Sequence, residues 1–218
     1  MRAVEKPKVL TFDIFGTVLD WRGGLAGMVR ALGYPFREEI DFDRVIHAQA
    51  ADEQARYSRY RDIVARSLHS VLDIPLPGAD LIGARAGGWP LFADSKVALA
   101  RLQRAVPCIA MTNSDVAHGK QVQAQLGFEL SGWVCAEDVG CYKPAKEFWH
   151  AVAKLKCLEL DASWWHVAAY GDYDLTPAHE LGLTTVFIGR PHSVPYPTSD
   201  FSFRDLAGLA NFVVPETR

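Results

Sequence analysis

The sequence predicts an α/β protein with a parallel sheet covered by helices on both faces and a helical segment inserted after the first strand. Short apolar runs alternate with stretches of helical periodicity from residue 90 onward. Between the first apolar run and residue 90, helical spacing predominates and no convincing strand pattern occurs. The 218 residues suffice for one such domain with a modest insertion. Strands that alternate with helices form βαβ units, whose strands pair in parallel.

The first strand is expected at Lys8–Phe15, a run rich in β-branched and aromatic residues that ends at Gly16. From about residue 24 to residue 73, apolar residues recur at spacings of three, four and seven. Prolines and a glycine at 75–78 are expected to break this pattern before a short helix near 79–86. We therefore expect two domains, which are a core of residues 1–17 and 90–218 and a helical cap of residues 18–89.

The chain after residue 90 is expected to alternate helices and strands. These are a helix near 95–105, a strand at 107–111, a helix near 114–126, a strand at 133–136, a helix near 144–155, a strand at 165–170, a helix near 176–181 and a strand at 184–189. Pro144 suits the first turn of its helix. The tail from Pro191 is expected to be irregular.

Composition and charge exclude several classes of protein. With 49% hydrophobic and 22% charged residues, the chain can bury a core, which excludes a disordered protein. A net charge of −3 favours neither nucleic acid nor membrane as a partner. The first residues lack the apolar segment of a signal peptide, and no apolar stretch is long enough to span a bilayer. Four cysteines without a CxxC pair are sparse for a disulfide scaffold, so we expect a reduced, cytoplasmic protein.

Polar side chains are expected at the carboxyl ends of several strands, where open parallel sheets bind ligands. They are Asp13 and Thr17 after the first strand, Thr112, Asn113 and Ser114 after the second, Lys143 before the third core helix, and Asp172 and Asp174 after the strand at 165–170. The set combines carboxylates, a lysine and small polar groups. The seven histidines show no metal-ligand spacing, and none is expected at this site.

Asp13 lies between the apolar residues Phe12 and Ile14, where an uncompensated carboxylate is costly to bury. An aspartate at a strand end also commonly caps the following turn. Lys143 is the expected partner, because the attraction at ~4 Å and an effective dielectric near 20 is on the order of 4 kcal/mol. An ionised, poorly solvated carboxylate is a nucleophile as well as a base. We therefore predict a functional role for Asp13.

The segment Thr112-Asn113-Ser114 lies at a strand-to-helix junction, where residues of these types cap the helix. The same junction offers free N–H groups and the positive end of the helix dipole to an anionic substrate. Capping and anion binding are compatible, so both interpretations stay open.

Four short motifs, in this order along the chain, resemble those of the haloacid dehalogenase (HAD) superfamily. They are Phe12-Asp13-Ile14-Phe15-Gly16-Thr17-Val18, Met111-Thr112-Asn113-Ser114, Tyr142-Lys143-Pro144 and the segment from Val167 to Asp174. The resemblance implies a Rossmann-like doubly wound parallel sheet with an inserted helical cap. It places Asp13 at the nucleophile position.

Phe15 indicates which branch of that superfamily the chain resembles. Its magnesium-dependent phosphatases have a second aspartate there, which protonates the leaving alkoxide, and a phenyl ring cannot act as a general acid. A halide leaves as a stable anion and needs no proton. The continuation to Asp20-Trp21-Arg22 resembles the 2-haloacid dehalogenase (type II) branch. The resemblance implies an (S)-2-haloacid dehalogenase-type hydrolase for small L-2-haloacids such as haloacetate and 2-chloropropionate, with no metal or other cofactor.

The resemblance also implies a two-step mechanism. Asp13 displaces the halide by SN2 attack with inversion and forms an aspartyl ester, which water hydrolyses at the Asp13 carboxyl carbon. The resemblance implies that Lys143 pairs with Asp13 and that Asp174 holds Lys143 and helps position or activate the water. It implies that Thr17 supports the nucleophile and that Asn113 contacts the halide. The implied site for the substrate carboxylate consists of Thr112 and the backbone N–H groups of Ile14 and Phe15.

Related dehalogenases bind the halide with a cap arginine, for which Arg56 is the candidate here. A solvated helix charge beside Asp52 and Glu53 is an equally good interpretation of Arg56. Two other functions stay open. They are a magnesium-dependent phosphatase that uses Asp172 and Asp174, and a catalytically silent protein that binds small carboxylates. The resemblance further implies a homodimer as a candidate assembly.

Overall fold

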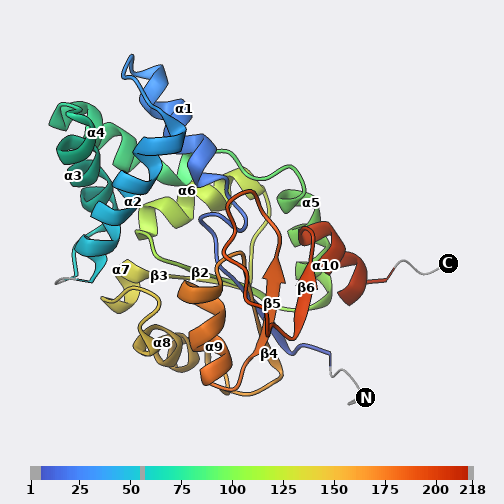
Figure 1. Ribbon diagram of the computed structural model, residues 1–218. Coiled ribbons are helices and arrows are strands. Elements are labelled where there is room, and N and C mark those ends of the chain that lie inside the picture. The colour runs from blue at the N-terminus through green and yellow to red at the C-terminus, as the bar shows by residue number, and fades with distance from the viewer. Residues whose placement is uncertain (1–5, 55–56, 216–218) are drawn as a thin grey trace.

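Six strands form one sheet in the computed structural model, which describes residues 6–54 and 57–215 (Figure 1). They are β1 (Val9–Phe12), β2 (Cys108–Thr112), β3 (Gly132–Cys135), β4 (Trp164–Ala168), β5 (Thr184–Ile188) and β6 (Phe201–Phe203). Every neighbouring pair is parallel, and the spatial order is β3-β2-β1-β4-β5-β6. The strand order therefore reverses between β1 and β4, the kind of position at which doubly wound sheets bind ligands. The predicted fold class is confirmed.

Helices cover both faces of the sheet, as parallel strands require. One apolar cluster includes side chains of α5 (Ser95–Ala105), α6 (Val116–Leu126) and α10 (Leu206–Val213). A second cluster includes side chains of α8 (Lys146–Lys156) and α9 (Thr176–Glu180), next to the short α7 (Ala136–Val139). Figure 1 shows α5 and α10 on the opposite side of the strands from α8 and α9. Residues of β1, β2 and β4 are all buried, because apolar side chains cover them from both sides.

The chain between β1 and β2 contains helices before α5. They are α1 (Trp21–Ala31), α2 (Glu38–Glu53), α3 (Tyr60–Leu72), α4 (Leu76–Ala84) and a 3₁₀ turn at Ala86–Gly88. Figure 1 shows α1–α4 grouped together at one end of the sheet. The predicted helical insertion is therefore present. Its division from the core at residues 17/18 and 89/90, as two domains, stays a prediction.

One prediction about prolines is confirmed in part and another is wrong. The helical pattern does break before Pro75, because α3 ends at Leu72, but α4 begins at Leu76, earlier than expected, with Pro77 in its first turn. The first turn tolerates proline because its N–H groups have no intrahelical partner. Pro144, in contrast, does not belong to a first turn, since α8 begins at Lys146 and the Lys143–Pro144 peptide bond is cis.

The prediction of an irregular tail is also wrong, because the tail contains β6 and α10. Strand β6 pairs with β5, and its Phe201 stacks on Trp165 of β4 with ring centroids 4.6 Å apart. At the start of α10, the Asp205 side chain accepts a hydrogen bond from the Gly208 N–H at 2.8 Å. The prediction overlooked local signals, because Phe201 and Phe203 alternate with Ser202 and apolar residues recur with helical spacing at 206, 209, 210 and 213.

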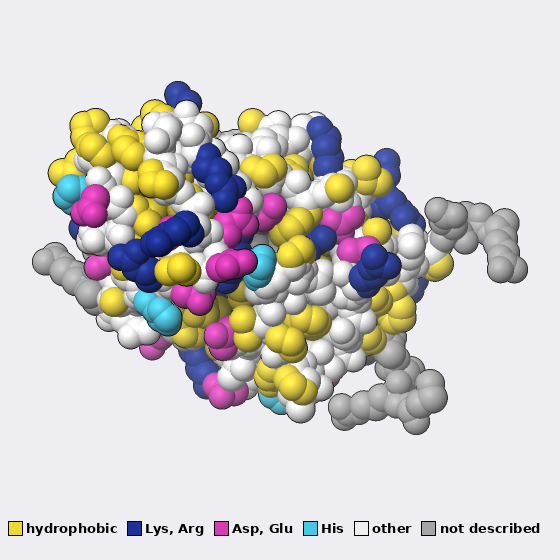
Figure 2. Space-filling model, turned by 45° about the horizontal axis from the view of Figure 1, so that its top comes forward, with side chains coloured by type: hydrophobic (Ala, Val, Ile, Leu, Met, Phe, Trp, Pro, Cys, Tyr) yellow, Lys and Arg dark blue, Asp and Glu magenta, His cyan; other side chains and the backbone are white. Residues whose placement is uncertain are grey.

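The surface in Figure 2 intersperses Lys and Arg side chains with Asp and Glu side chains, which agrees with the small net charge. Within residues 6–54 and 57–215, no helix is long and apolar enough to cross a membrane.

Candidate active site

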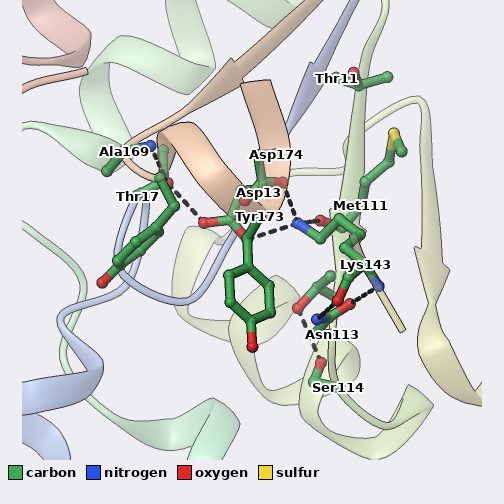
Figure 3. Close-up of polar contacts among 12 residues, drawn as sticks. Thr11, Asp13, Thr17, Met111, Asn113, Ser114, Lys143, Ala169, Tyr173 and Asp174 are labelled. Atoms are coloured by element: carbon green, nitrogen blue, oxygen red, sulfur yellow. Dashed lines mark hydrogen bonds and ion pairs between the residues drawn. The ribbon is translucent and has the colours of Figure 1, made fainter. Parts of the chain in front are cut away.

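Asp13 follows β1 directly and lies where the strand order of the sheet reverses. Its backbone N–H donates to the carbonyl of Val167 on β4 at 3.0 Å, which holds it at the end of both strands. The residue is only 5% exposed. Its Oδ1 accepts a hydrogen bond from Lys143 Nζ at 2.9 Å, and its Oδ2 accepts one from Thr17 Oγ1 at 2.7 Å (Figure 3). The structure thus brings together the carboxylate and lysine that the sequence analysis paired.

Lys143 is buried between two carboxylates. Its Nζ donates to Asp13 Oδ1 at 2.9 Å, to Asp174 Oδ1 at 2.5 Å and to the Met111 carbonyl at 3.1 Å (Figure 3). An ammonium group has three protons to donate, and these contacts use all of them. The side chain is therefore held in one position with its charge directed at the Asp13 carboxylate.

The three charges shift one another's pKa values. Burial lowers the pKa of Lys143, but the adjacent carboxylates of Asp13 and Asp174 outweigh it, and the net pKa is raised. Burial would raise the pKa of Asp174, but Lys143 and His166 hold it below its ordinary value. The pKa of Asp13 is raised, mainly because burial disfavours its charged form. The nearby negative charge of Asp174 adds to this increase, and the positive charge of Lys143 offsets it only in part. Ionised Asp13 is therefore more basic than an ordinary aspartate, which favours nucleophilic attack.

His166 belongs to this cluster, contrary to the expectation that no histidine lies at the site. Its Nε2 is 3.0 Å from Asp174 Oδ1, and its Nδ1 is 2.8 Å from Thr11 Oγ1. Because Thr11 Oγ1 accepts a hydrogen bond from Trp164 Nε1 at 2.7 Å, its own proton is available to Nδ1. His166 Nε2 then donates to Asp174. The β1–β4 register, which sets Thr11 opposite His166, makes this contact, so no spacing along the chain reveals it.

Asp174 lies on a π-helical turn, η2 (Gly171–Leu175), which follows β4. Thr17 approaches from the other side of Asp13, where its Oγ1 also accepts the Ala169 N–H at 2.9 Å. The Thr17 hydroxyl therefore receives one proton and donates its own to Asp13, which orients the carboxylate. The loop to Thr17 turns at Gly16, with φ +96°, where a Cβ atom would lie 2.5 Å from the Tyr170 ring.

The segment after β2 supports Lys143 through Asn113. The Asn113 Nδ2 donates to the Lys143 carbonyl at 2.9 Å, and the Lys143 N–H donates to Asn113 Oδ1 at 2.7 Å. Thr112 is 1% exposed, with its Oγ1 3.1 Å from Ser114 Oγ. Helix capping at this junction falls to Asp115, which also accepts N–H groups of Tyr60 and Arg61.

The remaining predicted site residues have different surroundings. The Ile14 side chain is fully buried, whereas Phe15 lines the cavity in front of Asp13. Among the described residues, the backbone N–H groups of Ile14 and Phe15 have no hydrogen-bond partner, so they are available to an anion beside Asp13. Arg56 lies outside the residues that the structure describes.

Comparison with known proteins places this geometry in a known fold. No family model matches the sequence, and no curated protein does so either. A solved L-2-haloacid dehalogenase does match the structure, with a TM-score of 0.84 over 96% of this chain and 100% of that chain at 23% identity. The chain has the haloacid dehalogenase fold. The resemblance to the haloacid dehalogenase superfamily is confirmed at the level of the fold.

Other solved structures share the haloacid dehalogenase fold with this chain. A defluorinating L-2-haloacid dehalogenase has a TM-score of 0.80 at 22% identity and covers 95% of each chain. The L-2-haloacid dehalogenase from Xanthobacter autotrophicus, with chloropropionic acid covalently bound, has a TM-score of 0.81 at 16% identity and covers 97% of this chain and 100% of its own. The HAD-hydrolase YfnB from Bacillus subtilis, bound to magnesium, has a TM-score of 0.79 at 15% identity and covers 96% of this chain and 99% of its own.

The residues around Asp13 do not fit a magnesium site of the kind expected for a phosphatase of the haloacid dehalogenase fold. Magnesium takes oxygen ligands in near-octahedral geometry. Here the Lys143 ammonium lies against both Asp13 and Asp174, and Phe15 offers no oxygen. Asp172 is exposed and accepts the Tyr173 N–H. Within the described ranges, no group of three or more metal-ligating side chains is present.

A cavity of about 250 Å³ lies in front of Asp13, lined in part by Lys143 and Asn113. Two charged residues that line this cavity, Arg22 and Glu53, were not predicted as site residues from the sequence. Arg22, on α1, has a buried Nε without a hydrogen-bond partner among the described residues, and its guanidinium lies 5.0 Å from the Phe42 ring centroid. Glu53 lies on the last turn of α2. Arg22 stands in the Asp20-Trp21-Arg22 segment, whereas no sequence signal points to Glu53.

Proposed function

We propose that this protein is a hydrolase that cleaves the carbon–halogen bond of small L-2-haloacids such as haloacetate and 2-chloropropionate. The observation that carries the proposal is a buried aspartate, Asp13, that faces a cavity while its charge is held by Lys143. Phe15 supplies no proton to a leaving group, so the site favours a leaving group that departs as a stable anion.

In the first step, a carboxylate oxygen of Asp13 attacks the halogen-bearing carbon. The new carbon–oxygen bond forms as the carbon–halogen bond breaks, and the halide leaves with the bonding electrons. The backbone N–H groups of Ile14 and Phe15 bind the substrate carboxylate, and Asn113 and Arg22 receive the halide. Arg22 thereby serves as an anion partner, the role for which the sequence analysis considered Arg56. Thr112, which the sequence analysis gave a share in carboxylate binding, is buried and does not line the cavity.

In the second step, water attacks the carboxyl carbon of the Asp13 ester. Collapse of the tetrahedral intermediate breaks the bond between that carbon and the substrate oxygen, which releases a 2-hydroxy acid of inverted configuration. The Lys143 ammonium, 2.9 Å from Asp13 Oδ1, stabilises the oxyanion that forms on this carboxyl group. Asp174 holds Lys143, and Thr17 holds the other oxygen of Asp13.

Halide release from racemic 2-chloropropionate in the presence of EDTA tests this function. We expect release by the wild type, and release at background level by Asp13→Asn, because an amide is a poor nucleophile. Asp43→Asn, at an exposed position of α2, is the matched control and should release halide like the wild type.

Two outcomes would replace the proposal. Chelator-sensitive hydrolysis of an aryl phosphate, without halide release, would indicate the phosphatase. Thermal stabilisation by 2-haloacids without turnover would indicate the silent binding protein, since a ligand that binds the folded state raises its stability.

A further inference from the structure

Glu53 belongs to the cavity that contains the nucleophile. It lies on the last turn of α2, is partly buried, and lines the same cavity as Asp13 and Lys143. It also lines an adjoining cavity with Lys143 and Tyr173, so it faces the mouth of the site from the side of α2. A carboxylate at this place is unexpected in a pocket for anionic substrates, because it repels the substrate when it is ionised.

The hydrolytic step needs a group that accepts a proton from water, and Asp174 is poorly suited to it. Its Oδ1 already receives hydrogen bonds from Lys143 at 2.5 Å and from His166 at 3.0 Å. The positive charge of Lys143 keeps the pKa of Asp174 below its ordinary value in spite of burial. A carboxylate with a low pKa is a weak base. Asp174 is therefore occupied as the group that positions Lys143.

Glu53 has the properties that Asp174 lacks. No hydrogen bond or ion pair joins its carboxylate to another side chain in the part of the chain that the structure describes. Burial raises the pKa of Glu53 to about 7, which the charge of Lys143 offsets only in part. A general base is most effective when its pKa lies near the working pH, where enough of it is ionised and it still binds a proton well.

As a step of the function proposed above, we propose that Glu53 is the catalytic base for hydrolysis of the Asp13 ester. Its carboxylate takes a proton from the water whose oxygen bonds to the Asp13 carboxyl carbon. When the ester bond breaks, the departing oxygen of the 2-hydroxy acid takes that proton back from Glu53. The regenerated Asp13 carboxyl group keeps the second proton of the water and releases it to solvent, which restores both carboxylates. The overall reaction then yields the 2-hydroxy acid, the halide and one proton. Formation of the ester does not involve Glu53.

Other charged groups face Glu53 across the two cavities. Lys143, Asp13 and Asp174 form the cluster described above, and Asp172 lines both cavities. Arg22 on α1 and the exposed His192 complete the charged and titratable wall of the larger cavity, beside tyrosines that include Tyr60 and Tyr173. Because several titratable side chains line this wall, a pH profile by itself does not identify the base. The test therefore follows the covalent intermediate.

The experiment mixes Glu53→Gln with excess 2-chloropropionate and follows halide release and intact-protein mass. We expect a burst of one halide per active site, followed by turnover reduced about 10²–10⁴-fold, the range that general base catalysis contributes. The mass of the protein should increase by that of the ester on Asp13. Glu53→Asp, which keeps a carboxylate, should restore part of the turnover. Asp43→Asn should show neither a burst nor an added mass.

The outcomes separate this proposal from the proposed function. Wild-type protein that releases no halide overturns the proposed function and this step with it. Wild-type release together with Glu53→Gln turnover within a few-fold of it overturns the role of Glu53 alone. Slow turnover by Glu53→Gln without a burst or an added mass also overturns it, because the variant would then be impaired in structure or in ester formation.

Discussion

The positive charge of Lys143 offsets the negative charges of two buried carboxylates, those of Asp13 and Asp174. The stability of the site therefore depends more on Lys143 than on any single hydrogen bond. We predict that Lys143→Ala lowers the free energy of unfolding by about 3–5 kcal/mol, because Asp13 and Asp174 are left buried without their partner. Urea unfolding at neutral pH measures this loss. Halide release should be lost as well, because the oxyanion of the second step has no cation beside it.

Lys146→Ala is the matched control for that prediction. Lys146 forms an ion pair with Glu180 at 2.7 Å, but the two side chains are 46% and 52% exposed. An exposed pair contributes at most about 1 kcal/mol. Equal unfolding free energies for the two variants would contradict the structural role assigned to Lys143.

At the scale of an element, the last turn of α2 places Glu53 in the cavity wall. Its burial there lowers the free energy of unfolding by an amount that depends on pH. The pKa of Glu53 is about 7 in the folded protein, above its ordinary value of 4.5. The folded state therefore holds a proton that the unfolded state loses between these values, and stability falls as pH rises through this window. Above pH 7, the ionised Glu53 carboxylate lowers the free energy of unfolding by up to about 3 kcal/mol, since one unit of pKa shift corresponds to about 1.36 kcal/mol.

Glu53→Gln should therefore be more stable than the wild type at pH 8, by up to about 3 kcal/mol, and should differ little from it near pH 4. Urea unfolding at both pH values checks this. Asp43→Asn, on the exposed side of the same helix, should show no such change with pH. A Glu53→Gln variant that is less stable than the wild type at pH 8 would show that the carboxylate has a stabilising partner.

At the scale of the whole molecule, Arg190 joins three segments that are distant in sequence. Its Nε donates to the Thr17 carbonyl at 2.9 Å, and its two terminal nitrogens donate to the Asp94 carboxylate at 2.7 Å and 3.2 Å. Asp94 Oδ2 in turn accepts the N–H of Leu206, the first residue of α10, at 2.7 Å. The loop that bears Thr17, the start of α5 and the C-terminal helix thus share one partly buried ion pair.

We predict that Arg190→Met destabilises the protein by about 1.5–3 kcal/mol, because it removes the charge-assisted hydrogen bonds to Asp94. Chemical denaturation gives the value. Arg104→Met, at an exposed position of α5, serves as the control and should change stability by less than about 0.5 kcal/mol. A loss at Arg190 no larger than at Arg104 would mean that this ion pair does not hold the three segments together.

The assembly and surroundings of the molecule stay predictions from its sequence. A small halocarboxylate as partner, the absence of nucleic-acid and membrane partners, a homodimer and a cytoplasmic location belong to this group. The mixed surface charge in Figure 2 is compatible with them and tests none of them.

The sequence by itself determined the layout of the sheet and the position of the principal charged residues. Apolar runs locate β1, β2, β4 and β5 to within a few residues, and the helix expected near 95–105 is α5. Asp13 and Asp174 follow strands, and Lys143 precedes a helix. Because parallel strands end at the same edge of the sheet, their order along the chain was enough to predict that these side chains lie close together.

Only the tertiary structure decided which other groups complete the site. His166 reaches Asp174 through the register of β1 and β4, and Arg22 and Glu53 reach the cavity through the packing of the inserted helices over the sheet edge. These contacts join residues far apart in sequence, and local periodicity contains no record of them. Strand β6 and helix α10 likewise take their places in the fold by pairing with β5 and packing against α5.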